Sequence, residues 1–155
     1  MMAQNQEAGI YFRQARLFAT LLLVVFPILY LVIAFFVTSE KNADAGANQM
    51  VLYMLMVVAM IQPTAFFLFR KMQVGNYKKS PQAKMSPGQL YLTLEIMKLA
   101  LIEAVFIYGL VMIIIAGKFE NLIYFYVIGI IWSVALWPRR SVMATFMKNL
   151  EEHGT

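Results

Sequence analysis

Three ionisable side chains lie inside one long apolar run of this chain, from Leu90 to Ala116. Glu95 and Lys98 are three residues apart, a spacing that places them on neighbouring helix surface. They can pair with each other or extend to the cytoplasmic headgroups, and we expect a structural role for them. Glu103 lies about 20 Å along the same helix from Leu90, too deep for so short a side chain to reach an interface. A carboxylate at that depth costs roughly 2.5 to 3.5 kcal/mol on insertion scales. It therefore requires a proton, a cation or a polar partner.

Two interpretations of Glu103 stand side by side. In the first it is a neutral, hydrogen-bonded carboxylic acid that fixes helix packing. In the second it is an ion or proton site, the usual role of an acid within a membrane span. Small residues on its helix face, Ala100 and Ala104, predict close approach of another helix or subunit. The candidate polar partners are Gln62, Thr64 and Tyr108.

Enzymatic chemistry is not indicated by the remaining residues. Hydrolysis within a membrane requires a serine with a base, a pair of aspartates or a metal cluster. The sole histidine, His153, lies near the end of the chain, and the sole aspartate, Asp44, lies in a polar loop. Cysteine is absent, so thiol chemistry, disulfides and cysteine metal sites are not expected. We expect a protein that is not an enzyme, without a cofactor or a metal.

Composition predicts the class of the protein. The chain is 61% hydrophobic and 14% charged, with a mean hydropathy of +0.68, values typical of polytopic membrane proteins. We predict an all-α fold of four transmembrane helices, arranged as two antiparallel hairpins, with a C-terminal interfacial amphipathic helix. The expected spans are about 17–37, 50–69, 90–116 and 122–137, followed by the interfacial tail 139–152, in a single domain over residues 1–155.

Local signals add detail to these spans. Pro27 lies in the middle of the first span and predicts a kink there. Gln62, Pro63 and Thr64 favour a local kink in the second span over a contact between Gln62 and another helix. Residues 70–89 are expected to form the longest loop, because Gly75 and three later breakers interrupt it. Gly129 and Ser133 form a pair of small residues that allows close helix packing.

Basic residues lie at the ends of the apolar runs, which predicts the orientation of the chain. Lys41 and Lys118 fall on one side of the membrane. The other side has Arg13, Arg16, Arg70, Lys71, Lys78, Lys79, Lys84, Arg139, Arg140 and Lys148. By the positive-inside rule both termini are cytoplasmic, and we expect a multi-pass protein of a bacterial cytoplasmic membrane. The formal charge of +5 indicates contacts with anionic lipid headgroups and not with nucleic acid, with Lys78, Lys79, Lys84, Arg139 and Arg140 as candidates.

One segment resembles a known family. Ala100, Glu103 and Ala104, followed by Ile107, Tyr108, Gly109, Leu110 and Val111, resemble the carboxylate helix of the proteolipid c subunit of rotary ATP synthases. The resemblance implies that Glu103 is the ion carrier of an oligomeric ring. The whole chain is more similar to small four-helix membrane proteins of bacteria.

The favoured function is that of a small, non-enzymatic membrane protein. It would act as a subunit of a larger membrane complex or as a homo-oligomer, with Glu103 as a protonatable site at a helix contact. The first alternative is proteolipid-like translocation of a proton or cation through Glu103. The second is a lipid-interacting membrane accessory factor. The expected partners are the lipid bilayer and other membrane subunits or a second copy.

Overall fold

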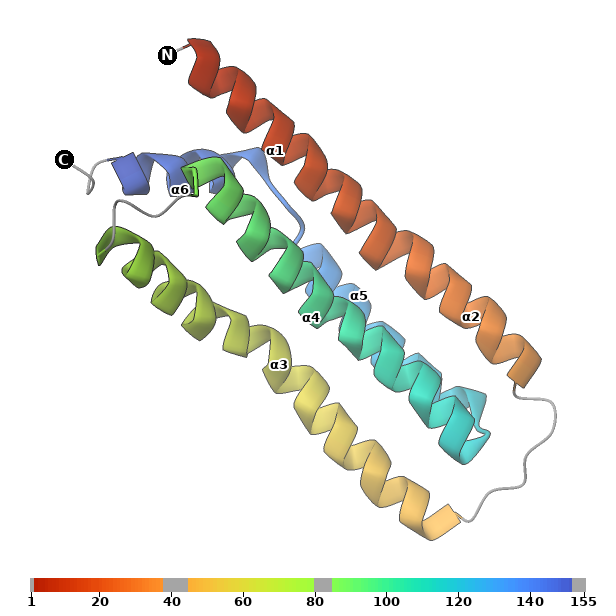
Figure 1. Ribbon diagram of the computed structural model, residues 1–155. Coiled ribbons are helices and arrows are strands. Elements are labelled where there is room, and N and C mark those ends of the chain that lie inside the picture. Colours follow the sequence, from red (N-terminus) through yellow and green to blue (C-terminus); the bar gives the residue numbers. More distant parts are fainter. Residues whose placement is uncertain (1, 38–44, 80–84, 152–155) are drawn as a thin grey trace.

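All elements described by the computed structural model, which covers residues 2–37, 45–79 and 85–151, are helical. The chain begins with α1 (Met2–Thr20), a π-helical turn η1 (Leu21–Val25) and α2 (Phe26–Val37), which together form one long rod (Figure 1). Three further helices lie alongside it, α3 (Ala45–Lys79), α4 (Pro87–Ala116) and α5 (Phe119–Ala135). The short helix α6 (Arg140–Glu151) lies across the end of the molecule where both termini are found (Figure 1).

Three helical stretches within the described residues are long and apolar enough to cross a membrane. They are Gly9–Phe36, Gln49–Lys79 and Pro87–Ala116. Helix α5 is shorter, and it meets the same test only together with α6, from which it is bent by 58°. The predicted all-α class is confirmed for the described residues. Four spans were predicted, and three to four helices are long and apolar enough to be spans.

Two prolines lie inside the long helices and have different effects. Pro27 has no N–H, and its ring crowds the carbonyl one turn earlier. The helix widens just before it, where the Phe26 N–H donates to the Leu21 oxygen five residues back. The Pro27 carbonyl accepts a hydrogen bond from the Tyr126 hydroxyl of α5, so the irregularity ties α2 to α5. Pro63, by contrast, lies within an uninterrupted α3.

The bounds of the third and fourth helices differ from the expected loop over residues 70–89. Helix α3 continues to Lys79. Gly75 alone does not end it, because the basic residues that follow Phe69 have good helix propensity. Their positive charges also interact favourably with the negative C-terminal end of the helix dipole. Helix α4 begins at a capping box, in which the Ser86 side chain and the Gln89 side chain each accept from the other's backbone N–H. It ends at Gly117, whose φ of 65° is a left-handed conformation suited to glycine.

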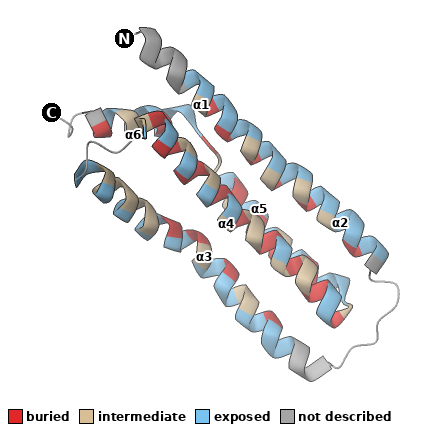
Figure 2. Ribbon diagram, in the orientation of Figure 1, coloured by how far each residue is buried: buried red, intermediate tan, exposed pale blue. Residues whose placement is uncertain are grey.

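Helix α4 is the centre of the molecule. It packs against α1, η1, α2, α3, α5 and α6, and 44% of its most apolar stretch is buried, against 22% and 17% in the other two spanning helices. Figure 2 shows the difference, with buried residues concentrated on α4 and exposed ones along α2 and α3. The other two spanning helices therefore leave most of their apolar surface exposed.

The predicted pairing of the first two spans as a packed hairpin is wrong. Helix α3 packs against α4 and α5, whereas any contacts of α3 with α1 or α2 are far fewer. Short loops favour neighbours in space, but α4 needs partners on both of its flanks, because polar side chains project from more than one side of it. The helices α2 and α3 therefore lie on opposite sides of α4 (Figure 1).

The contact between α4 and α5 depends on a glycine. Gly129 is buried, and a Cβ atom placed there would lie 2.6 Å from the Phe106 ring, which is itself 1% exposed. One turn later the Ser133 hydroxyl donates to the Gly129 carbonyl at 2.7 Å, so it has no need of a partner on α4. Small residues at both positions let the two helices approach closely.

We expect Gly129→Ala to lower the thermal unfolding temperature of the purified protein in detergent, because overpacking of a filled contact costs about 1 to 3 kcal/mol. The matched control is Gly75→Ala, where the added Cβ meets nothing within 4 Å and the gain in helix propensity is about 0.5 to 1 kcal/mol. Equal unfolding temperatures for the two variants would contradict the close contact.

Candidate functional site

Glu103 is held by a tyrosine from the N-terminal rod. The Tyr30 hydroxyl of α2 donates to Glu103 Oε1 at 2.7 Å, and the bond is partly buried. Glu103 lies about 24 Å along α4 from Pro87 and about 20 Å from Ala116, so it is near the middle of the helix. The tyrosine satisfies one carboxyl oxygen without the need for a second charge.

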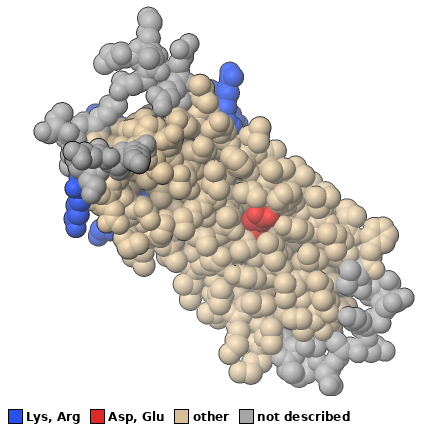
Figure 3. Space-filling view, viewed as in Figure 1, with Lys and Arg blue, Asp and Glu red and all other residues tan. Residues whose placement is uncertain are grey.

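The flank of α4 around Glu103 is open. Glu103 and Ala104 are only partly buried, and Ala100 and Ile107 are exposed one turn to either side. Figure 3 shows one acidic spot about halfway along this face, surrounded by uncharged side chains. Glu95 is buried, and Glu120 lies at the start of α5. A carboxyl group thus reaches the surface of the bundle in its apolar middle.

The predicted partners of Glu103 lie elsewhere. Tyr108 donates its hydroxyl to Gln62 Oε1 at 2.6 Å, which joins α4 to α3. Thr64 is exposed on α3. Gln62 therefore does face another helix, although the sequence favoured a local kink. Helix α4 is joined to α2 by the Tyr30–Glu103 hydrogen bond and to α3 by the Tyr108–Gln62 hydrogen bond.

A second polar cluster lies closer to the basic end of α4. Glu95 and Lys98 are 6% and 7% exposed, and Glu95 Oε2 lies 2.5 Å from Lys98 Nζ. The two opposite charges attract each other across this short contact. The hydroxyl of Tyr91 is buried beside the same carboxylate. Charged side chains at this depth are expensive to desolvate and are retained where they are paired.

A cavity of about 230 Å³ opens beside this cluster. Its lining includes the pair Glu95 and Lys98, together with Arg70 from α3 and Arg139 from the segment between α5 and α6. Three cations thus face one carboxylate, which leaves the site with an excess of positive charge.

The predicted headgroup residues lie at one end of the molecule. Lys78, Lys79, Arg139 and Arg140 are exposed there, and Figure 3 shows lysine and arginine atoms only towards that end of the visible face. Arg140 also lies over the Phe12 ring, 5.4 Å from its centroid. Lys84 lies outside the described residues.

The sequence did not single out Tyr30, Tyr91 or Arg70 as members of these sites. Tyr30 lies 73 residues from Glu103, and a single tyrosine in an apolar run is common in membrane helices. The one feature of the sequence that could have indicated this partner is the position of the Tyr30 hydroxyl near the middle of its span. Glu103 lies at a similar depth in its own span. Arg70 was assigned to a loop, whereas it lies in the continuous helix α3.

Comparisons with protein-family models, with curated proteins and with solved structures found no match. The functional inferences therefore depend on the residues of this chain.

We expect Lys98→Met to destabilise the protein by about 3 kcal/mol, because it leaves the Glu95 carboxylate buried without its cation. The second change Glu95→Leu should restore most of the lost stability, since an apolar pair of similar volume replaces the ion pair. Thermal unfolding in detergent micelles measures both. If Lys98→Met has no effect while Glu95 is intact, the charge pairing does not hold this end of α4.

Proposed function

We propose that this protein is a non-enzymatic integral membrane protein that acts as a subunit of a larger complex or as a homo-oligomer, and that its contact surface is the flank of α4 around Glu103. The proposal includes four spans, with α5 as the fourth, and a cytoplasmic location for the basic end, which has both termini. The membrane would be a bacterial cytoplasmic one. The excess of lysine and arginine at this end supports the orientation.

The single observation behind the proposal is the partial exposure of Glu103 in the apolar middle of α4. Tyr30 satisfies one carboxyl oxygen, and the other has no hydrogen bond among the described residues. A polar atom facing hydrocarbon costs several kcal/mol. A helix of another subunit with a polar side chain or an accessible carbonyl would remove that cost, since a protonated carboxyl can donate to it.

The residues around Glu103 suit a helix contact. Ala100 and Ala104 have small side chains, and they flank the carboxyl on the open side of α4. Small residues let the backbones of two membrane helices approach closely enough for interhelical hydrogen bonds. Large exposed residues, such as Phe35 and Phe36 near the end of α2, are more suited to lipid.

We expect a single cysteine at Ala100→Cys to cross-link to a neighbouring subunit in native membranes, because the natural chain has no cysteine and thus no background. In that chain Glu103→Gln should preserve the cross-link, since an amide can still donate to a partner. Glu103→Ala should reduce it severalfold. Cross-linked product is measured by electrophoresis after oxidation or treatment with a bifunctional reagent.

Ile61→Cys is the matched control for this experiment, because Ile61 is 59% exposed and lies beside Gln62, at the level of the α3–α4 polar pair but on α3. The proposal predicts little cross-linking there. Equal cross-linking at both positions, or none at Ala100, would count against a subunit contact at Glu103.

A second candidate function is translocation of a proton or a cation by Glu103. It is supported by the open position of the carboxyl beside a hydroxyl donor, which would allow the group to exchange its proton with a neighbouring subunit. The similarity of residues 100–111 to the proteolipid helix points the same way.

If Glu103 is a carrier, proteoliposomes of the purified protein should show proton or sodium flux that Glu103→Gln abolishes while the Ala100→Cys cross-link persists. Flux is measured with an enclosed pH-sensitive or sodium-sensitive dye. Flux that is absent in the natural chain, or unchanged in Glu103→Gln, would contradict the carrier function and leave the packing function intact.

A further inference from the structure

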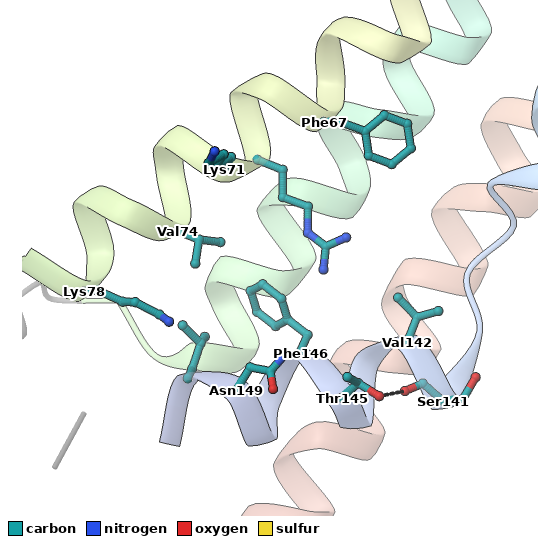
Figure 4. Close-up of a pocket in the computed structure, with 11 residues that line it drawn as sticks. Phe67, Lys71, Val74, Lys78, Ser141, Val142, Thr145, Phe146 and Asn149 are labelled. Carbon is teal, nitrogen blue, oxygen red and sulfur yellow. Dashed lines mark hydrogen bonds between the residues drawn. The ribbon is translucent and has the colours of Figure 1, made fainter. Parts of the chain in front are cut away.

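A groove lies between α3 and α6 at the basic end of the molecule. Helix α6 turns across this end and packs Met143, Phe146 and Leu150 against residues of α1, α3 and α4. The space left between α6 and α3 is a hollow of about 520 Å³, within the range of small-molecule sites. Figure 4 shows Lys78 reaching from α3 towards α6, and the Phe146 ring rising between the two helices.

The groove has a basic side. Arg70, Lys71 and Lys78 line it from α3, and no acidic side chain of the described residues lines it with them. Glu95, which lines the adjoining cavity together with Arg70, is paired with Lys98. The α6 side adds the Ser141 hydroxyl, whereas the Thr145 hydroxyl donates to the Ser141 carbonyl. A site with three cations and a neutral hydroxyl is complementary to an anion with several oxygens.

The groove also has an apolar side. Phe67 and Val142 line one part of it, and Val74, Phe146 and Leu150 line the rest. Phe67 is 48% exposed and Val142 is 41% exposed, so apolar surface lies directly beside the cations. Free phosphate has no apolar part that could contact this surface. A lipid has both a charged headgroup and an apolar acyl chain.

The position of the groove agrees with that of a lipid headgroup. Arg70 follows directly after the apolar part of α3, and its guanidinium stacks over Phe146, 5.4 Å from the ring centroid. Lys78 lies about 12 Å further along the same helix. The groove therefore extends from the apolar part of the bundle into its basic end, which is the level at which lipid phosphates meet protein cations.

We propose that this groove binds an anionic phospholipid, whose phosphate is held by Arg70, Lys71 and Lys78 and whose acyl chain lies along Phe67 and Val142. The site is distinct from Glu103 and does not depend on the proposed subunit contact. The sequence predicted only a general attraction between the basic residues and anionic lipids. The proposal specifies one site in which a lipid is bound.

Native mass spectrometry of the full chain in detergent, with added phosphatidylglycerol, tests the proposal. Arg70→Gln and Lys78→Gln should each weaken retention of the lipid about fivefold, the usual contribution of one basic residue near an anionic lipid. Lys79→Gln is the matched control, because Lys79 is the next residue of α3, is exposed, and does not line the groove. It should have little effect.

A steric variant keeps every charge. Thr145→Trp would fill the groove, since Thr145 is exposed and lines it, whereas Ala144→Trp places the same side chain on an exposed position outside the lining. We expect lipid retention to fall only for Thr145→Trp. Circular dichroism and unfolding temperature establish that both variants fold.

Three ligands distinguish the source of the phosphate. Phosphatidylglycerol should bind at least tenfold more tightly than phosphatidylcholine with the same chains, and millimolar inorganic phosphate should not displace it. Displacement by inorganic phosphate would overturn the assignment to a lipid. Equal losses in Lys78→Gln and Lys79→Gln, or equal effects of the two tryptophans, would overturn the defined groove.

Discussion

The arrangement of this protein depends on one constraint, which is that polar side chains on an apolar helix must find polar partners. Helix α4 has a buried ion pair near its basic end, a carboxyl near its middle and a tyrosine one and a half turns beyond. The carboxyl is met by Tyr30 of α2 and the tyrosine by Gln62 of α3. Because these partners approach from different sides, α4 is surrounded, and the helices that precede it in sequence are held apart.

The same constraint divides the molecule along its length. At the basic end, charge is abundant and is partly neutralised inside the protein by the Glu95 carboxylate, which leaves Arg70, Lys71 and Lys78 facing a groove. In the middle, charge is scarce, and the single carboxyl of Glu103 reaches an apolar surface with only one hydrogen bond. We therefore propose different partners for the two sites, an anionic lipid for the first and a neighbouring helix for the second.

Several features of this fold follow from local sequence, and these were predictable. The helical class and the apolar runs follow from composition, and the closeness of Glu95 and Lys98 follows from their spacing on a helix. The partner of Glu103 was not predictable, because Tyr30 is brought to it only by packing of helices distant in sequence. The extension of α3 to Lys79 was missed because Gly75 was taken as a breaker, although neighbouring residues of good helix propensity outweigh one glycine. The placement of α2 and α3 on opposite sides of α4 was not predicted. The prediction of a packed hairpin relied on the short loop and did not consider which helices must supply hydrogen-bond partners to α4.

The most direct test of this account is solid-state NMR of the labelled protein in lipid bilayers, with transfer of magnetisation from water and from aromatic carbons to the glutamate carboxyl groups. The account predicts a contact between the Glu103 carboxyl and the Tyr30 ring, and slow transfer from water to Glu103. Glu120, which is exposed at the start of α5, should receive it quickly. Rapid transfer from water to Glu103, without a contact to Tyr30, would contradict the account.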